Sequence, residues 1–76
     1  MEAEVMKMLA VGLTAGLGLM GPALGIGLIG FSALKGIARN PEASGPIMTN
    51  MILVTAFCEA IGIYALIIAI ILAMIV

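Results

Sequence analysis

Charged residues are scarce in this chain. They make up 9% of its 76 residues, whereas a soluble domain has about 25%. Hydrophobic residues account for 64%, against about 45–50% in soluble domains. A chain this short cannot bury so much apolar surface in a core of its own, which excludes a soluble catalytic domain. The composition predicts a membrane protein surrounded by membrane lipid.

Histidine and tryptophan are absent, and the formal net charge is −1 with no cluster of basic residues. Nucleic-acid binding depends on such a cluster, so we expect no nucleic-acid partner. Metal sites combine imidazoles, thiolates or several carboxylates, and the deepest carboxylate, Glu59, has no such companion. No nucleophile has a base beside it, and no phosphate-binding glycine motif occurs. We therefore expect no catalytic residue, no metal, no cofactor and no enzymatic activity in the chain on its own.

Cysteine occurs once, as Cys58. A disulfide within the chain is therefore excluded, and we expect Cys58 to act as a small buried hydrophobic residue. The N-terminal sequence MEAEVMKM is acidic and lacks the positive region of a signal peptide. We expect the apolar stretch that follows it to be a span of the mature protein.

Two long stretches carry almost no charge. The first lies between Lys7 and Lys35, and the second runs from residue 43 to the end with Glu59 as its single interruption. Each exceeds the roughly 20 residues that a membrane-spanning helix needs. Asn40 and Pro41 between them form a helix stop signal. The sequence predicts an all-α transmembrane hairpin in one domain, with helix 1 over 5–39, a polar loop over 39–42 and helix 2 over 43–75.

The basic residues predict how this hairpin is oriented. Lys35 and Arg39 adjoin the loop, whereas Lys7 alone marks the opposite end. Cytoplasmic loops carry an excess of Lys and Arg. We therefore expect a multi-pass integral membrane protein with a cytoplasmic loop and both termini on the other side.

Helix 1 is rich in glycine, which favours close packing. Small residues spaced by four let helix backbones approach closely in lipid. At about 100° per residue, the small residues of helix 1 fall on two nearly opposite stripes. Repeated copies can grip a helix on both sides by closing into a ring. One stripe consists of Gly12, Gly16, Ala23, Gly27 and Gly30, and the other of Gly18, Gly21 and Gly25.

Pro22 also lies in the glycine-rich part of helix 1, and we expect a slight bend there.

Glu59 is the only charged residue expected deep in the bilayer. An ionised side chain there costs about 2.5 kcal/mol or more, so such a residue marks a functional site. Desolvation favours the neutral, protonated carboxyl, which needs hydrogen-bonding partners. Folding the hairpin about Asn40 and Pro41 brings Glu59 level with Gly21–Ile26. A lone carboxyl whose charge can be switched is suited to carrying a proton or sodium.

Few polar groups can reach Glu59. Tyr64 points about 140° away on an ideal helix, so the Tyr64 of a neighbouring copy is the better candidate. Thr55 lies one turn before Glu59, but such a hydroxyl usually bonds its own helix backbone. The rest of this face is apolar, which predicts contact with lipid or a subunit seam rather than a wet pore. It consists of Met48, Ile52, Gly62, Ile63 and Leu66.

Three motifs resemble one known family, the c subunit of F-type ATP synthase. They are GPALGIG at residues 21–27, ARNPEA at residues 38–43 and EAIGIY at residues 59–64. The resemblance covers nearly the whole chain, in order and at the right spacing. It implies a homo-oligomeric rotor ring of identical subunits, with helix 1 inside and helix 2 outside.

The resemblance also implies a role for Glu59. Its carboxyl would be protonated while it faces lipid and would release the proton opposite an arginine of the stator a subunit. The backbone carbonyl of Phe57 and the phenol of Tyr64 would hold it. Ring rotation would then couple proton flow across the membrane to ATP synthesis on the soluble head.

The partners implied by the resemblance include more than the stator. Arg39, Asn40 and Pro41 would meet the gamma and epsilon subunits of the central stalk. The complex would lie in a bacterial plasma membrane. Adjacent copies would pack through the small residues Gly16, Gly21, Ala23, Gly25 and Gly27.

Two positions bear on the transported ion. Sodium-binding members of the family carry a glutamine at the position of Ile26 and a hydroxyl side chain at the position of Ala60. Sodium needs several oxygen ligands, whereas a proton needs one good acceptor. We therefore expect a proton-carrying ring, with a sodium-carrying ring of the same family as the alternative.

Other classes of membrane protein fit less well. A small pore-forming, holin-like oligomer would line its pore with a polar stripe, which this chain lacks. A proton-coupled multidrug exporter would need more spans and more aromatic residues than the 4% present. A purely structural assembly protein would not need Glu59, because Gln or Ser could make the same hydrogen bond at lower cost.

Overall fold

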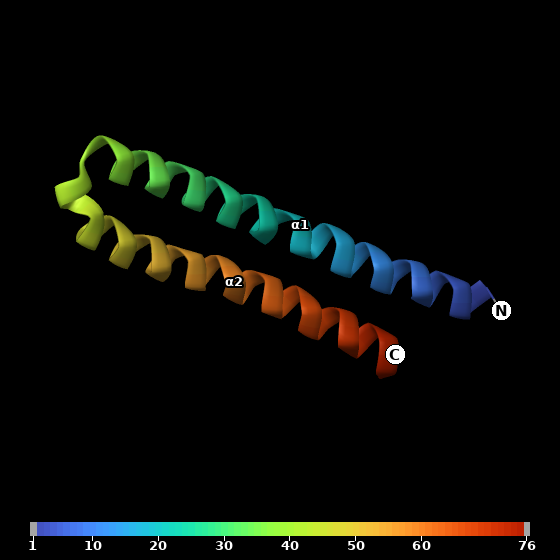
Figure 1. The fold of residues 1–76 in the computed structure, drawn as a ribbon. Coiled ribbons are helices and arrows are strands. Elements are labelled where there is room, and N and C mark those ends of the chain that lie inside the picture. Colours follow the sequence, from blue (N-terminus) through green and yellow to red (C-terminus); the bar gives the residue numbers. More distant parts are fainter. Residues whose placement is uncertain (1, 76) are drawn as a thin grey trace.

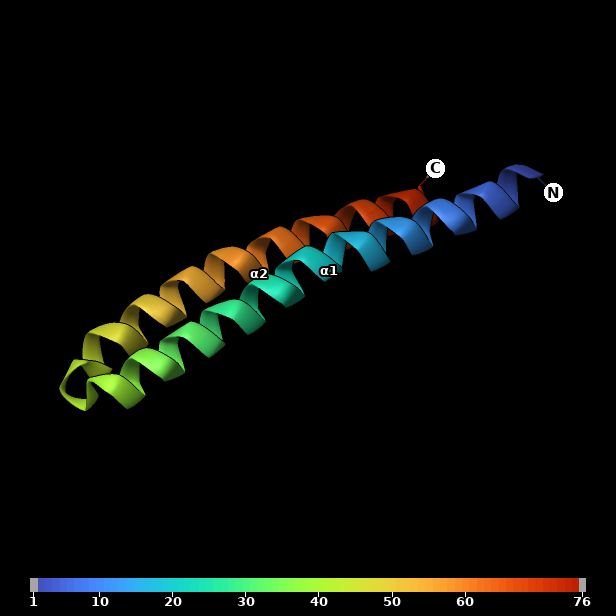
Figure 2. The same cartoon turned by 90° about the horizontal axis from the view of Figure 1, so that it is seen from above.

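The structure is a computed structural model and describes residues 2–75. The chain forms a helical hairpin in which α1 (Glu2–Arg39) leads to a short 3-10 turn, η1 (Pro41–Ala43), and α2 (Ser44–Met74) runs back. The two helices lie side by side in both views, and α1 continues past the C-terminal end of α2 (Figure 1, Figure 2). The predicted all-α hairpin is confirmed.

The surface of the hairpin suits a membrane. Both helices are long and apolar enough to cross one. Among the described residues only Gly62 and Ala69 are buried, so large apolar side chains face outward on all sides. A helix that is apolar all round belongs in lipid or in a larger helical assembly. The hairpin is 60 Å long, twice the hydrocarbon core of about 30 Å, so its two ends reach the polar regions.

The helices differ slightly from the expected bounds. α1 begins at Glu2 rather than at residue 5. Glu2 and Glu4 lie in its first turn, where carboxylates stabilise the positive end of the helix dipole. At the other end of the turn, Ala43 belongs to η1, so α2 starts at Ser44 rather than at residue 43.

Asn40 and Pro41 reverse the chain. The backbone of Asn40 leaves the helical region, with φ −133° and ψ 80°. The ring of a following proline disfavours the helical conformation, which accounts for this change. The N–H of Asn40 still donates to the carbonyl of Gly36 at 2.9 Å, and its carbonyl accepts from Ala43 at 2.9 Å. The turn therefore ends α1 without a left-handed residue.

Three glycines of α1 let the helices approach closely. A methyl group added to Gly18, Gly25 or Gly36 would lie 2.6 Å from Ala65 Cβ, 2.8 Å from Cys58 Sγ or 3.1 Å from Ile47 Cδ1, respectively. The three contacts keep one antiparallel register along the hairpin, which brings Glu59 to the depth of Leu24. On the α1 side, the seam between the helices is thus formed by glycines at these three contacts, which allow close packing in lipid.

The two predicted glycine stripes have different surroundings. Gly18 and Gly25 face α2, whereas an added Cβ at Gly21 would meet nothing within 4 Å. Gly25 packs against Cys58 of its own chain because the hairpin register places that residue opposite it, and its expected contact between copies stays a prediction. The glycines of the other stripe face open space; they are Gly12, Gly16, Gly27 and Gly30.

Candidate functional site

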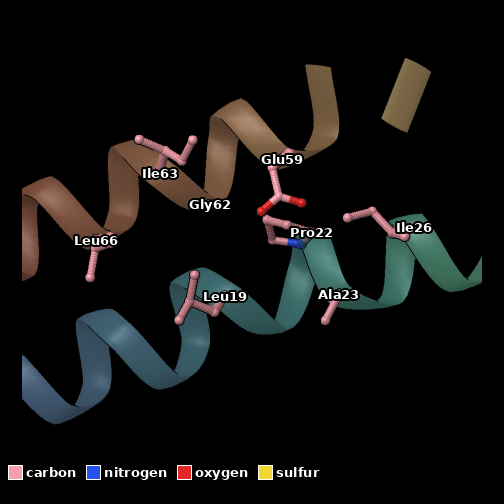
Figure 3. A pocket seen from close by; sticks show the side chains of 8 residues that line it. All are labelled: Leu19, Pro22, Ala23, Ile26, Glu59, Gly62, Ile63 and Leu66. Atoms are coloured by element: carbon pink, nitrogen blue, oxygen red, sulfur yellow. The ribbon is translucent and has the colours of Figure 1, made fainter. Parts of the chain in front are cut away.

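Glu59 lies midway along α2, on one flank of the hairpin. Its side chain reaches into a cavity of about 300 Å³ between the two helices. Figure 3 shows the carboxyl group pointing from α2 toward α1, over the ring of Pro22. The other residues that line this cavity are Leu19, Pro22, Ala23, Ile26, Gly62, Ile63 and Leu66. The other side chains that line this cavity are therefore all apolar, and they form one wall beside the carboxyl.

Gly62 keeps this cavity open. It lies one turn after Glu59 and is buried against α1. An added Cβ would lie 3.4 Å from Leu19 Cδ2 and 3.6 Å from Pro22 Cβ. An alanine would therefore touch α1 in ordinary contact, and any larger side chain would occupy space beside the carboxyl.

Glu59 has no polar partner in the described part of the chain. None of the side-chain hydrogen bonds there involves it, and its side chain is exposed. A neutral carboxyl is tolerated in apolar surroundings far better than an ionised one. The described part of the hairpin offers no hydrogen-bonding partner to this carboxyl.

The residues expected around Glu59 are only partly gathered by one chain. Ile26 lines the cavity, as its depth suggested. Tyr64 and the side chain of Phe57 are 64% and 65% exposed and lie outside the cavity. Ala60 is half-buried and also lies outside it. One copy thus supplies the acid and an apolar wall, while the predicted roles of Tyr64 and of the Phe57 carbonyl stay predictions.

The hydroxyl of Thr55 does not join the site. Thr55 is half-buried, does not line the Glu59 cavity and makes no side-chain hydrogen bond within the described residues. Backbone bonding within one helix does occur nearer the turn, where Thr49 donates to the Gly45 carbonyl at 3.1 Å. Asn50 donates in the same way to Pro46.

The predicted loop contacts lie at the closed end of the hairpin, away from both termini (Figure 1). Arg39, Asn40 and Pro41 are all exposed there. One turn before Arg39, the ammonium group of Lys35 lies 5.1 Å from the centre of the Phe31 ring, a cation–π contact. The tip therefore presents a polar surface with two cations to its surroundings.

Sequence reasoning missed a contact between Cys58 and Pro22. The thiol of Cys58 donates to the Pro22 carbonyl across the seam, at 3.4 Å. α1 stays one continuous helix through Pro22. The sequence contained one indication of this contact, because Cys58 and Gly25 lie at equal depth in the hairpin. A glycine on the facing helix leaves space for the sulfur of a cysteine between the helices.

Comparisons with known proteins agree with this geometry. The family model for the ATP synthase C subunit matches residues 9–72. The chain is 60% identical over 72 residues to an ATP synthase c subunit of Dehalococcoides mccartyi, covering 95% of both chains. It is 46% identical over 66 residues to one of Prochlorococcus marinus, covering 87% of this chain and 82% of that one. For Petrotoga mobilis the identity is 44%, covering 87% and 69%. The chain therefore belongs to the family of ATP synthase c subunits, the non-catalytic, ion-transporting membrane subunits of that rotary complex.

Proposed function

We propose that this protein carries protons on Glu59, which is reversibly protonated as a ring of identical copies turns and drives ATP synthesis. The observation that carries the proposal is the position of Glu59. Its carboxyl lies midway along α2 on one flank of the hairpin, beside apolar residues and without a hydrogen-bonding partner among residues 2–75. Such a group stays neutral until a charge from another protein stabilises its ionised form.

Release of the proton requires a positive charge that this hairpin does not place near Glu59. The resemblance to the family supplies one, an arginine of the stator a subunit. A membrane potential drives each charge with about 2.3 kcal/mol per 100 mV, so synthesis of one ATP takes several protons. Repeated copies of the site around a ring meet that requirement.

The two flanks of α1 support assembly into a ring. Ala23, a member of the open glycine stripe, lines the Glu59 cavity, so this flank is shallow. Viewed along the axis of α1, Leu17 and Leu24 lie on the other side of Gly18 from the open glycine stripe, rotated from Gly18 by about 100–120°. Both leucines are exposed. The groove of small residues on one copy can therefore receive the leucine ridge of the next copy, which gives a head-to-tail contact. A head-to-tail contact forms a closed ring when its rotation permits.

The same arrangement favours a site shared between copies. Glu59 and Tyr64 point about 140° apart around α2. In a head-to-tail ring, the exposed Tyr64 of one copy approaches the Glu59 flank of the next. The neighbouring phenol then supplies the hydrogen bond that a neutral carboxyl needs and that its own chain lacks.

The cavity favours a proton over sodium. Sodium requires several oxygen ligands at once, and hard cations of this kind are held by carboxylates, carbonyls and hydroxyls. The lining residues other than Glu59 are apolar, and Ile26 stands where sodium-binding relatives carry an amide. Ala60 offers no hydroxyl. The carboxyl can bind a proton by itself.

The exposed tip supports the proposed orientation and contacts. Lys35 and Arg39 adjoin it, which favours a cytoplasmic loop with both termini across the membrane. We assign Arg39, Asn40 and Pro41 to contact with the gamma and epsilon subunits, in a bacterial plasma membrane.

Carbodiimide labelling tests the proposed cargo. A hydrophobic carbodiimide adds to a protonated carboxyl in an apolar setting, so labelling of Glu59 in the purified oligomer should fall as pH rises. Replacing potassium chloride by sodium chloride should leave the labelling rate unchanged. Mass spectrometry of the labelled peptide provides the measurement. The Glu42→Gln variant, which removes an exposed carboxylate at the turn, is the matched control and should label like the unaltered chain. Strong protection by sodium would establish a sodium ring instead.

A further inference from the structure

We propose that Cys58 is a positioning residue, whose thiol anchors α2 to Pro22 and thereby directs the Glu59 carboxyl into its cavity. This inference rests on the proposed role of Glu59 as the proton carrier. It assigns to the single cysteine of the chain a function that depends on its hydrogen bond as well as on its volume.

The first observation is the fit of the sulfur. The Cys58 thiol donates to the Pro22 carbonyl at 3.4 Å, and the two residues come from different helices. A Cβ at Gly25, three residues further along α1, would lie only 2.8 Å from the sulfur. The thiol therefore occupies a space bounded by a carbonyl group and a glycine. A thiol bond is weak in water, but lipid offers no competing donor.

The second observation is that Pro22 contacts both the anchor and the site. Its carbonyl accepts from Cys58, while its ring lines the Glu59 cavity. The same ring approaches Gly62, where an added Cβ would lie 3.6 and 3.7 Å from two of its carbon atoms. Figure 3 shows the Glu59 carboxyl over this ring. The turn of α2 that carries Cys58, Glu59 and Gly62 thus packs against Pro22 of α1.

Sequence adjacency links the two side chains. Consecutive residues point about 100° apart around a helix, so the direction of Cys58 fixes that of Glu59. With the thiol in the seam, the carboxyl lies on the flank over Pro22. A rotation of α2 that breaks the thiol bond would also move the carboxyl relative to its apolar wall.

The thiol acts through position and not through charge. The faces of α1 and α2 that surround the Glu59 carboxyl contribute Leu19, Pro22, Ala23, Ile26, Gly62, Ile63 and Leu66, none of which is titratable. Any change in the pH dependence of Glu59 on altering Cys58 therefore reports a change in the placement of the carboxyl.

The rate of carbodiimide labelling of Glu59 across pH tests this inference in the purified oligomer. In Cys58→Ala the carboxyl is held less firmly against its apolar wall and ionises more readily. Labelling at a pH where the unaltered oligomer is half-reactive should fall by about two- to fivefold, the effect of losing one weak hydrogen bond. Cys58→Ser keeps a donor and should restore the rate to within about twofold. An unchanged Cys58→Ala profile, or a Cys58→Ser profile like that of Cys58→Ala, would overturn the inference.

Infrared spectroscopy gives a second measurement that does not depend on a variant at Cys58. The chain has one cysteine, so its S–H stretching band belongs to Cys58 alone. We expect a band displaced to lower frequency in the unaltered oligomer, and a shift toward the free-thiol position in Gly25→Ala, whose new methyl group displaces the sulfur. A free-thiol band in the unaltered oligomer would refute the anchor, even where Cys58→Ala fails to assemble.

The two proposals fail in different ways. If labelling of the unaltered oligomer does not depend on pH, the proton-carrying role of Glu59 is wrong. If that dependence is present but Cys58→Ala does not change it, only the role of Cys58 is wrong.

Discussion

Glu59→Gln is expected to abolish proton translocation and leave the ring assembled. Glutamine matches glutamate in size and keeps a hydrogen-bonding amide, so the cavity beside Pro22 should remain filled in the same way. It cannot release a proton or become negatively charged. In ATP synthase reconstituted into vesicles, ATP-driven acidification measured with a pH-sensitive dye should fall to the level of carbodiimide-treated enzyme.

Two controls make this result specific. Glu42→Gln removes a carboxylate from the exposed turn, and its pumping should equal that of the unaltered enzyme. Native electrophoresis should show oligomers of unchanged size in both variants. Retained pumping by Glu59→Gln would show that the transported proton does not bind this residue.

The two glycine stripes are expected to respond differently to leucine. Gly18→Leu places a large side chain where even a methyl group would lie 2.6 Å from Ala65 Cβ, so the two helices of one chain must separate. A Cβ added at Gly16 meets nothing within 4 Å in its own hairpin, and we expect the leucine of Gly16→Leu to fill the groove proposed to receive the next copy. Overpacking costs about 1–3 kcal/mol at one site, and in a ring the cost recurs at every contact between copies.

Two measurements separate these effects. Distances between spin labels on α1 and α2, measured in detergent-dispersed single chains, should increase in Gly18→Leu and stay unchanged in Gly16→Leu. Native mass spectrometry should show loss of the ring, or a ring of different copy number, in Gly16→Leu. An intact ring of the original size in Gly16→Leu would rule out this groove as the contact between copies.

The hairpin and the depth of its acid could be predicted because they depend on patterns along one chain. Charge-free stretches and the Asn40-Pro41 stop determine where the helices lie and where they reverse. Counting outward from the turn placed Glu59 level with Gly21–Ile26, and its cavity is indeed lined by residues from that range of α1.

The rotation of each helix about its axis could not be predicted in the same way. Both glycine stripes of α1 are small enough to meet a partner, so composition alone cannot decide which one faces α2. That choice places Gly25 against Cys58 of its own chain, which the glycine pattern alone did not reveal. The bond from Cys58 to Pro22 depends on the same rotation and was missed with it.

The register of the seam has a mechanical consequence. The close contact of Gly18 with Ala65 lies on one side of Glu59 along the hairpin, and that of Gly36 with Ile47 lies on the other. The two helices are therefore held close together on both sides of Glu59 along the hairpin. A sideways force on Glu59 has no flexible joint to bend before it reaches the tip at Arg39. The two helices are therefore held together along most of their length, and under the proposed function torque applied at Glu59 would reach the tip with little elastic loss.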